Sequence, residues 1–180
     1  MYGIVNKAIE ELIIRDFGVE KWEIIKQKSG VDIDFFMSHE SYDDDVTYQL
    51  AGAAAEELKV SIGDILISFG EFWVLNTGKE KYGALMKTGG DNLKEFLINL
   101  PLFHNRVMVI YPKLTPPEFR ITNIEESSLF VHYISKRKGL QEFVRGLLQG
   151  LSKLYHVNTS IELLESRTEG KDHEIFKISW

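Results

Sequence analysis

The fold is decided in the stretch LTPPEFRITNI, residues 114–124, where helical periodicity ends and strand-like alternation begins. Pro116 and Pro117 cannot both lie inside a helix or a central strand, because proline lacks a backbone N–H and has a restricted φ angle. Before this stretch, apolar residues recur at helical spacing, as in Ile9 and Ile13. The chain is therefore predicted to change its class of secondary structure at the proline pair.

The residues after the prolines predict an antiparallel sheet with one helix. Two strand-like runs, Phe119–Ile124 and Ser128–Ser135, are separated by a polar turn, and an apolar helical stripe follows over Leu140–Leu154. A second pair of runs, Val157–Leu164 and Glu174–Ser179, closes the sequence. This order predicts an α+β fold, in which an N-terminal helical lobe precedes a C-terminal lobe with a four-stranded antiparallel sheet and helices.

Three expected helix starts carry local signals. Asp44-Asp45 would place negative charge at the positive end of a helix. Ser61, followed three residues later by Asp64, resembles a capping box, in which two side chains bond each other's backbone. Asp91 is predicted to cap a single helix that continues to Val107.

Composition excludes several classes of protein. The 180 residues suffice for one domain with a sizeable core, and the net charge of −6 disfavours nucleic acid and anionic membranes as partners. Without cysteine there are no disulfides, thiolate metal sites or catalytic thiols. No signal peptide is recognisable, and no apolar run approaches the ~20 residues that a membrane span needs. We expect a cytoplasmic protein.

The common catalytic motifs are missing from the sequence. There is no GxSxG, no HExxH and no GxGxxG after a strand, so we predict that the chain is not an enzyme. The alternative, an enzyme with His104 as general base, would need an acid or a nucleophile that spacing does not identify.

His104 is the first candidate binding residue. On a helix it shares one face with Leu100 and Val107, so its imidazole projects from an apolar stripe. One interpretation is a core histidine that is hydrogen-bonded to a neighbour, and the other is a metal ligand. A single histidine in an apolar pocket suits haem, which leaves only axial positions for the protein.

The segment Tyr133-Ile134-Ser135-Lys136-Arg137 is the second candidate. In an extended chain Tyr133, Ser135 and Arg137 point to one side, with Lys136 and Lys138 on the other side, toward water. Two hydroxyls and a guanidinium on one face can bind a carboxylate, such as a haem propionate. The alternative is a surface strand with a solvated arginine.

Together these features resemble the H-NOX family, the haem–nitric oxide/oxygen binding domains of bacterial gas sensors and of soluble guanylate cyclase. The sequence begins Met1-Tyr2-Gly3, as many bacterial members do, and His104 lies where the family places its proximal haem ligand. Pro117 matches the proline that presses on the haem, and residues 133–137 match the family's YxSxR propionate-binding motif.

The resemblance extends over nearly the whole sequence and implies the H-NOX fold with non-covalent haem b between two lobes. We expect a single domain over residues 1–180, with a mainly helical distal lobe at 1–60. The proximal lobe, at 61–180, would carry the histidine helix and the antiparallel sheet.

Family likeness also suggests which gas is bound. Oxygen-binding members carry a distal tyrosine on the helix after YxSxR, and Phe143, which has no hydrogen-bond donor, aligns with it here. Val5 and Ile9 would complete an apolar wall. Trp73 matches a polar distal position, and its indole N–H either donates to a ligand or only packs. We expect nitric oxide and carbon monoxide to bind, and oxygen not to bind appreciably.

The implied mechanism is weakening of the iron–His104 bond by nitric oxide, followed by relaxation of a haem that Pro117 and Arg137 hold distorted. The signal would pass to a separate partner, a histidine kinase or a cyclic-di-GMP enzyme, as in stand-alone bacterial members. Two alternatives stay open: an oxygen-binding haem sensor, and a non-haem binding module for another carboxylated apolar ligand.

Overall fold

The proline pair does separate helices from strands. The structure, a computed structural model, describes residues 1–110 and 116–180, so Leu114 and Thr115 of the predicted boundary lie outside the described residues. Pro116 and Pro117 lie in an irregular segment directly before the first strand.

The helices of the described chain are α1 (Gly3–Phe17), α2 (Val19–Ser29), α3 (Asp44–Leu58), α4 (Ile62–Phe72), α5 (Lys79–Lys87), α6 (Leu93–Ile98), α7 (Leu100–Ile110) and α8 (Gln141–Leu154). A π-helical segment, η1 (Trp73–Gly78), joins α4 to α5, and a short 3-10 turn, η2 (Arg167–Glu169), lies in the last hairpin. The strands are β1 (Glu118–Thr122), β2 (Ser128–Ile134), β3 (Ser160–Glu165) and β4 (Glu174–Ser179).

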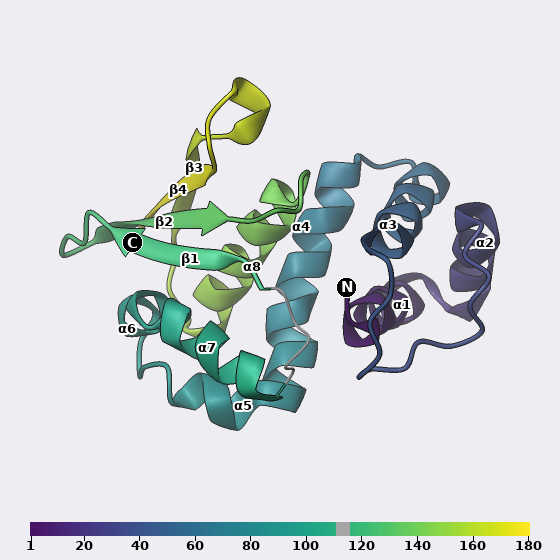
Figure 1. The fold of residues 1–180 in the computed structure, drawn as a ribbon, viewed down its shortest axis with the longest axis horizontal. Coiled ribbons are helices and arrows are strands. Elements are labelled where there is room, and N and C mark those ends of the chain that lie inside the picture. The colour runs from purple at the N-terminus through teal and green to yellow at the C-terminus, as the bar shows by residue number, and fades with distance from the viewer. Residues whose placement is uncertain (111–115) are drawn as a thin grey trace.

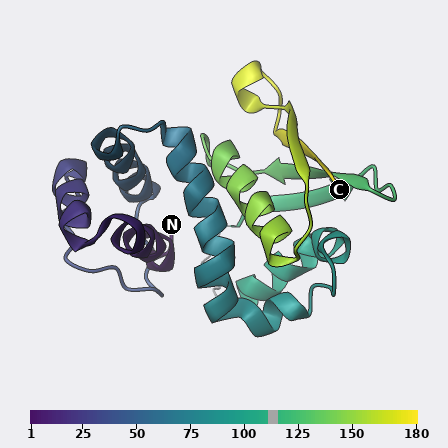
Figure 2. The same cartoon turned by 180° about the vertical axis from the view of Figure 1, so that it is seen from behind.

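The elements form a helical group on one side and a helix-and-sheet group on the other (Figure 1). Helices α1, α2 and α3 lie together, α4 runs through the middle, and the sheet lies beyond it. Seen from behind, α8 runs beside α4 and lies between it and the sheet (Figure 2). The sheet has the order β1-β2-β4-β3 with all pairs antiparallel, which confirms the predicted α+β class.

The sheet buries one face through strict alternation along its central strands. In β2, Leu129 and Val131 are fully buried, as are Phe176 and Ile178 in β4. Because side chains alternate between the two faces of a strand, Tyr133 belongs to the same buried face. The sheet therefore presents the end of β2 to the interior of the molecule.

Two of the predicted helix starts are confirmed. Ser61 and Asp64 form a complete capping box at the start of α4, and α3 begins with Asp44 and Asp45 in its first turn. The N-cap of α3 is the preceding residue, Asp43, whose carboxylate accepts from the Asp45 N–H at 3.0 Å.

The predicted single helix from Asp91 to Val107 is wrong. Asn92, not Asp91, is the N-cap, and the chain breaks into α6 and α7 at Asn99. Pro101 explains the break, because it has no N–H to continue the hydrogen-bond ladder of α6, whereas proline is well tolerated in the first turn of a new helix. The break gives α7 its own direction.

Helices α4 and α8 approach each other through glycine. A Cβ atom on Gly146 would clash with the carbonyl oxygen of Ile67, and one on Gly70 would clash with the carbonyl of Phe143. The two backbones are therefore in direct contact, and side chains larger than hydrogen do not fit at the crossing.

None of the helices in the described residues is both long and apolar enough to cross a lipid bilayer.

We predict that Gly146→Ala lowers the free energy of unfolding by about 1–3 kcal/mol, because the added methyl group must push α4 and α8 apart. The matched control is Gly52→Ala in α3, where an added Cβ meets nothing within 4 Å. There the gain in helix propensity should stabilise by roughly 0.5–1 kcal/mol. Urea unfolding followed by circular dichroism measures both, and equal effects at the two sites would contradict the packing argument.

Candidate functional site

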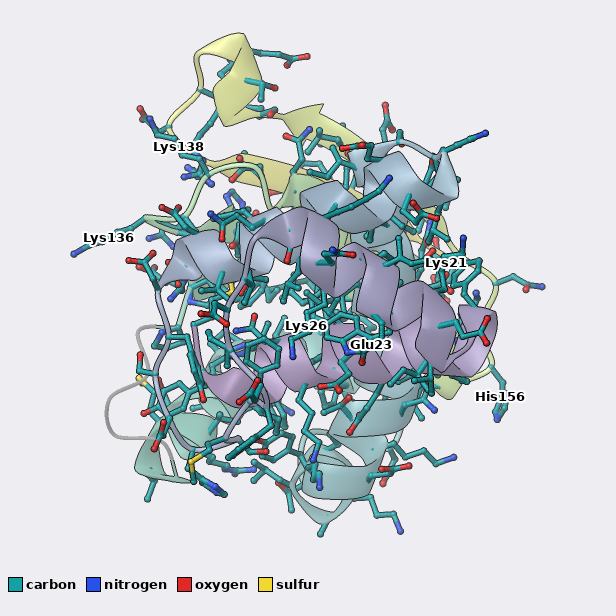
Figure 3. All side chains as sticks on the ribbon, turned by 90° about the vertical axis from the view of Figure 1, so that its right-hand side faces the viewer. Lys21, Glu23, Lys26, Lys136, Lys138 and His156 are labelled. Carbon is teal, nitrogen blue, oxygen red and sulfur yellow. The ribbon has the colours of Figure 1, made fainter. Side chains whose placement is uncertain are left out.

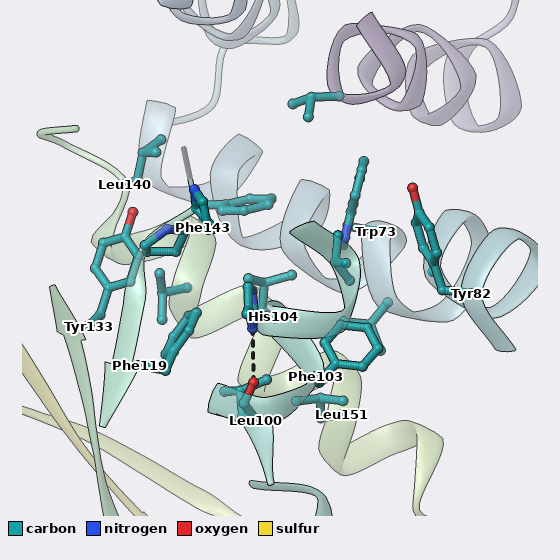
Figure 4. A pocket seen from close by; sticks show the side chains of 18 of the residues that line it. Trp73, Tyr82, Leu100, Phe103, His104, Phe119, Tyr133, Leu140, Phe143 and Leu151 are labelled. Carbon is teal, nitrogen blue, oxygen red and sulfur yellow. Dashed lines mark hydrogen bonds between the residues drawn. The ribbon is translucent and has the colours of Figure 1, made fainter. Parts of the chain in front are cut away.

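A cavity opens between the first turn of α1, the α4–α5 region, α7, α8 and the β2 end of the sheet (Figure 4). Its volume is about 240 Å³. A bound water needs only about 10–15 Å³ of such space, so the cavity can hold a ligand much larger than a water molecule. Most of its wall is aliphatic or aromatic. The side chains on the wall that can hydrogen-bond are Tyr2, Trp73, Tyr82, His104, Tyr133 and Arg137.

His104 lines this cavity from α7, one turn after Leu100. Its Nδ1 lies 3.1 Å from the carbonyl oxygen of Leu100, as the dashed line in Figure 4 shows. A carbonyl can only accept, so Nδ1 carries the proton and donates it, and Nε2 keeps its lone pair. The imidazole is held between Phe119 and Phe103, with ring centroids 4.8 Å and 5.7 Å away.

Burial lowers the pKa of the His104 imidazole, and the hydrogen bond to Leu100 only partly opposes this effect. The ring is therefore neutral at pH 7, the form in which histidine binds metals. The interpretation of His104 as a hydrogen-bonded core histidine agrees with the bond from Nδ1 to Leu100. The interpretation as a metal ligand agrees with the unprotonated Nε2.

Tyr133 and Arg137 line the same cavity, whereas Ser135 is not part of its wall. Strand β2 ends at Ile134, so the extended chain that would align all three side chains stops short. Ser135 instead accepts a hydrogen bond from the backbone N–H of Arg137 at 3.1 Å. Lys136 and Lys138 are exposed, as predicted, and extend into solvent (Figure 3).

Burial raises the pKa of the Tyr133 phenol, against the lowering effect of a hydrogen bond with Ser135. The phenol thus keeps its proton and can act as a donor beside the guanidinium of Arg137. Phe119 packs on the Tyr133 ring at 5.6 Å and on the His104 ring, so one aromatic side chain supports both polar groups.

Arg137 is tied to the helical group by an ion pair that sequence reasoning did not find. Its Nε donates to Asp44 at 2.8 Å, and the amino group of Met1 donates to the other oxygen of the same carboxylate at 2.6 Å. The local sequence indicates Asp44 only as part of a helix start. Its pairing joins residues 93 positions apart, and no local pattern marks such a contact.

Most of the residues predicted for the distal side of the ligand lie on the wall of this cavity. Val5, Trp73 and Phe143 line the cavity. Ile9 is fully buried in the core but does not line it. Only the first turn of α1 reaches the cavity, and four residues further along a helix is about 6 Å further away.

Tyr82 also lines this cavity, from α5, and was missed by sequence reasoning (Figure 4). Three charged residues, Lys79, Glu80 and Lys81, precede it, and α5 is weakly amphipathic, so the helical pattern does not single out Tyr82 as a cavity residue.

Comparison with known proteins gives one consistent family. A sequence profile described as Haem-NO-binding matches residues 2–163. Soluble guanylate cyclase gcy-32 of Caenorhabditis elegans is 27% identical over 178 residues, which are 96% of this chain and 26% of that protein. Guanylate cyclase soluble subunit beta-2 of Rattus norvegicus is 28% identical over 120 residues, 63% of this chain and 18% of that protein. The chain thus spans roughly a fifth to a quarter of the length of these relatives.

Solved structures agree with the fold. An H-NOX protein from S. oneidensis in the Fe(II)NO ligation state matches with a TM-score of 0.91 at 20% identity, over 99% of this chain and 98% of that one. An Fe(II) unliganded H-NOX protein from K. algicida matches with a TM-score of 0.86 at 24% identity, over 99% and 96%. The predicted H-NOX fold is confirmed.

We predict that Asp44→Asn lowers the free energy of unfolding at pH 7 by about 1 kcal/mol, because it removes two partly exposed ion pairs, with the Met1 amino group and with Arg137. Burial alone would raise the pKa of Asp44, but the hydrogen bonds from the Met1 amino group and Arg137 outweigh it and lower the pKa. The stabilisation is therefore present above the unfolded pKa, about 3.9, and is lost as the pH falls through the lower folded value.

Urea titrations of the wild type and Asp44→Asn at pH 7 and near pH 3 measure how the stabilisation by Asp44 depends on pH. Asp45→Asn is the matched control, since Asp45 lies in the same helical turn, is exposed and shares the helix-dipole effect. A destabilisation by Asp44→Asn that is no larger at pH 7 than that of the control would contradict the assignment.

Proposed function

The chain belongs to the Haem-NO-binding family of haem-binding gas-sensor domains, and from this membership we propose that it senses nitric oxide, and binds carbon monoxide, at a ferrous haem b held by His104. The observation that carries the proposal is the unprotonated Nε2 of a neutral imidazole on the wall of an apolar cavity. When bound, the haem would supply an iron that can bind a diatomic gas.

The donor set of the cavity fits this group. Haem needs a nitrogen ligand with a free lone pair, apolar surroundings for the ring and cationic or hydroxyl partners for two carboxylates. His104, the aromatic and aliphatic wall, and the Tyr133–Arg137 pair supply these three features around one cavity. Pro117 adds a rigid part of the wall, which supports its proposed role of pressing on the ring.

The hydrogen bond from Nδ1 to the Leu100 carbonyl orients the ring and increases the basicity of Nε2. The same bond ties the imidazole to the backbone of α7, which packs against β1. A displacement of the imidazole would therefore also displace α7 and β1, which lies at the edge of the sheet. We propose residues 1–60 and 61–180 as the two lobes whose relative position changes.

Phe143 supports the preference for nitric oxide and carbon monoxide over oxygen. Bound oxygen is stabilised by a hydrogen-bond donor, and a phenyl ring has none. One observation favours the alternative of an oxygen-binding sensor: Trp73 and Tyr82 bring an N–H and an O–H to the wall of the cavity. The Trp73 ring packs edge-to-face against the Phe69 ring, with the ring centroids 6.3 Å apart, which supports the interpretation of Trp73 as a packing residue.

The proposed partner is a signalling enzyme, either a histidine kinase or a cyclic-di-GMP enzyme. Resemblance to bacterial family members supports it. A partner must distinguish two arrangements of the lobes for gas binding to be transmitted.

We predict that His104→Gly abolishes the ferrous spectrum of the wild-type haem complex, and that added imidazole restores it by filling the space of the lost ring. The reduced protein is compared anaerobically by absorption spectroscopy with and without imidazole. His156→Gly, at an exposed histidine (Figure 3), is the matched control and should leave the spectrum unchanged. An unchanged spectrum in His104→Gly would refute the ligand assignment.

We predict that the reduced wild-type protein responds spectrally to nitric oxide and carbon monoxide but does not bind oxygen reversibly in air. Phe143→Tyr should introduce measurable oxygen affinity, since it adds a hydroxyl on the wall that Phe143 forms. Phe103→Tyr, which adds a hydroxyl beside His104 instead, is the control. Reversible oxygen binding by the wild type would exclude the selectivity and favour the oxygen sensor.

A further inference from the structure

Arg167, in the 3-10 turn between β3 and β4, holds the segment that carries Arg137. Its Nη1 donates to the carbonyl oxygen of Ser135 and its Nη2 to that of Arg137, both at 2.7 Å. Its Nε donates to the two carboxylate oxygens of Glu174, at 2.9 Å and 3.1 Å. One planar guanidinium thus fixes two backbone carbonyls on either side of Lys136.

The ion pair that provides this support is largely buried. The Glu174 side chain is 3% exposed and that of Arg167 is 18% exposed. Glu174 is the first residue of β4 and lies directly opposite Tyr133 in the sheet register. The anchor of the guanidinium is therefore a residue of the sheet, next to the tyrosine on the cavity wall.

The held segment lies outside the helices and strands. After β2 ends at Ile134, residues 135–140 have no regular secondary structure, and Lys136 and Lys138 are exposed. Other restraints on the segment are the bond from the Arg137 N–H to the Ser135 hydroxyl at 3.1 Å, the bond from the Tyr48 hydroxyl to the Lys138 carbonyl at 2.9 Å, and the ion pair of the Arg137 Nε with Asp44 at 2.8 Å. Loss of the guanidinium would leave both carbonyls to water and the backbone that carries Arg137 less restrained, with the Asp44 ion pair acting on the side chain alone.

We propose that Arg167, anchored by Glu174, is a positioning residue that aims the Arg137 cation into the cavity to bind a ligand carboxylate. Neither Arg167 nor Glu174 lines the cavity, so the effect acts through the backbone of residues 135–137. The inference rests on the proposed function, since it takes the carboxylates to be those of haem.

Arg167 restrains the segment through the shape of its guanidinium group and not through its positive charge alone. A lysine at position 167 keeps the positive charge beside Glu174 but cannot reach two carbonyls and a carboxylate with one ammonium group. Arg167→Lys therefore separates positioning from long-range attraction of an anion.

The first test measures the affinity of the apoprotein for hemin and for hemin dimethyl ester, which lacks the free carboxylates. The wild type should prefer hemin, and Arg167→Lys should reduce this preference about tenfold, the loss expected for a misplaced charged hydrogen bond. Arg137→Met should remove the preference, and adding Arg167→Lys to it should cause no further loss. The matched control is Arg120→Lys, on an exposed arginine paired with Glu118.

A second test needs no haem. Trypsin should cut the apoprotein after Lys136, Arg137 and Lys138 several-fold faster in Arg167→Lys than in the wild type or Arg120→Lys, as followed by mass spectrometry. Circular dichroism establishes that each variant is folded.

The outcomes separate the two claims. A wild type that binds neither porphyrin overturns the proposed function, while faster cleavage would still support the restraint of the segment by Arg167. A wild type that prefers hemin, with the same preference in Arg167→Lys, overturns the positioning role. Equal weakening of hemin and its ester in Arg167→Lys would also overturn it, because general destabilisation does not discriminate between them.

Discussion

The hydrogen bond between Nδ1 of His104 and the Leu100 carbonyl is the constraint on which the site depends. It exists because Pro101 ends α6 and lets α7 start at Leu100, one turn before the imidazole. With Nδ1 committed to the backbone, Nε2 keeps a lone pair that the protein does not use internally. Aromatic packing by Phe119 and the neutral state of the ring then leave this nitrogen available to a ligand in a mostly apolar wall.

Local signals predicted much of the fold. Apolar periodicity located the helices, the Ser61–Asp64 capping box marked a real helix start, and the run after Pro117 indicated antiparallel strands. Each of these features depends on residues within a few positions of one another. His104 could be predicted to project from an apolar stripe for the same reason, because three- and four-residue steps determine the face of a helix.

Features set by tertiary geometry escaped prediction. Ile9 shares a helical face with Val5, but the direction of α1 takes it away from the cavity. The ion pair of Asp44 with Arg137 and the hold of Arg167 on the segment after β2 join distant parts of the chain, and charged residues there look like any solvated surface. Sequence periodicity indicates on which face of a helix or strand a side chain lies, but it does not indicate which other elements pack against that face.

The cavity also affects how the protein is made. The cavity, of about 240 Å³, is lined mostly by apolar side chains that only the folded chain brings together. Any molecule that fills it stabilises the native state by mass action. The yield of folded chain from a producing cell should therefore track the supply of that molecule, and newly synthesised chains in starved cells should be the ones that proteases remove.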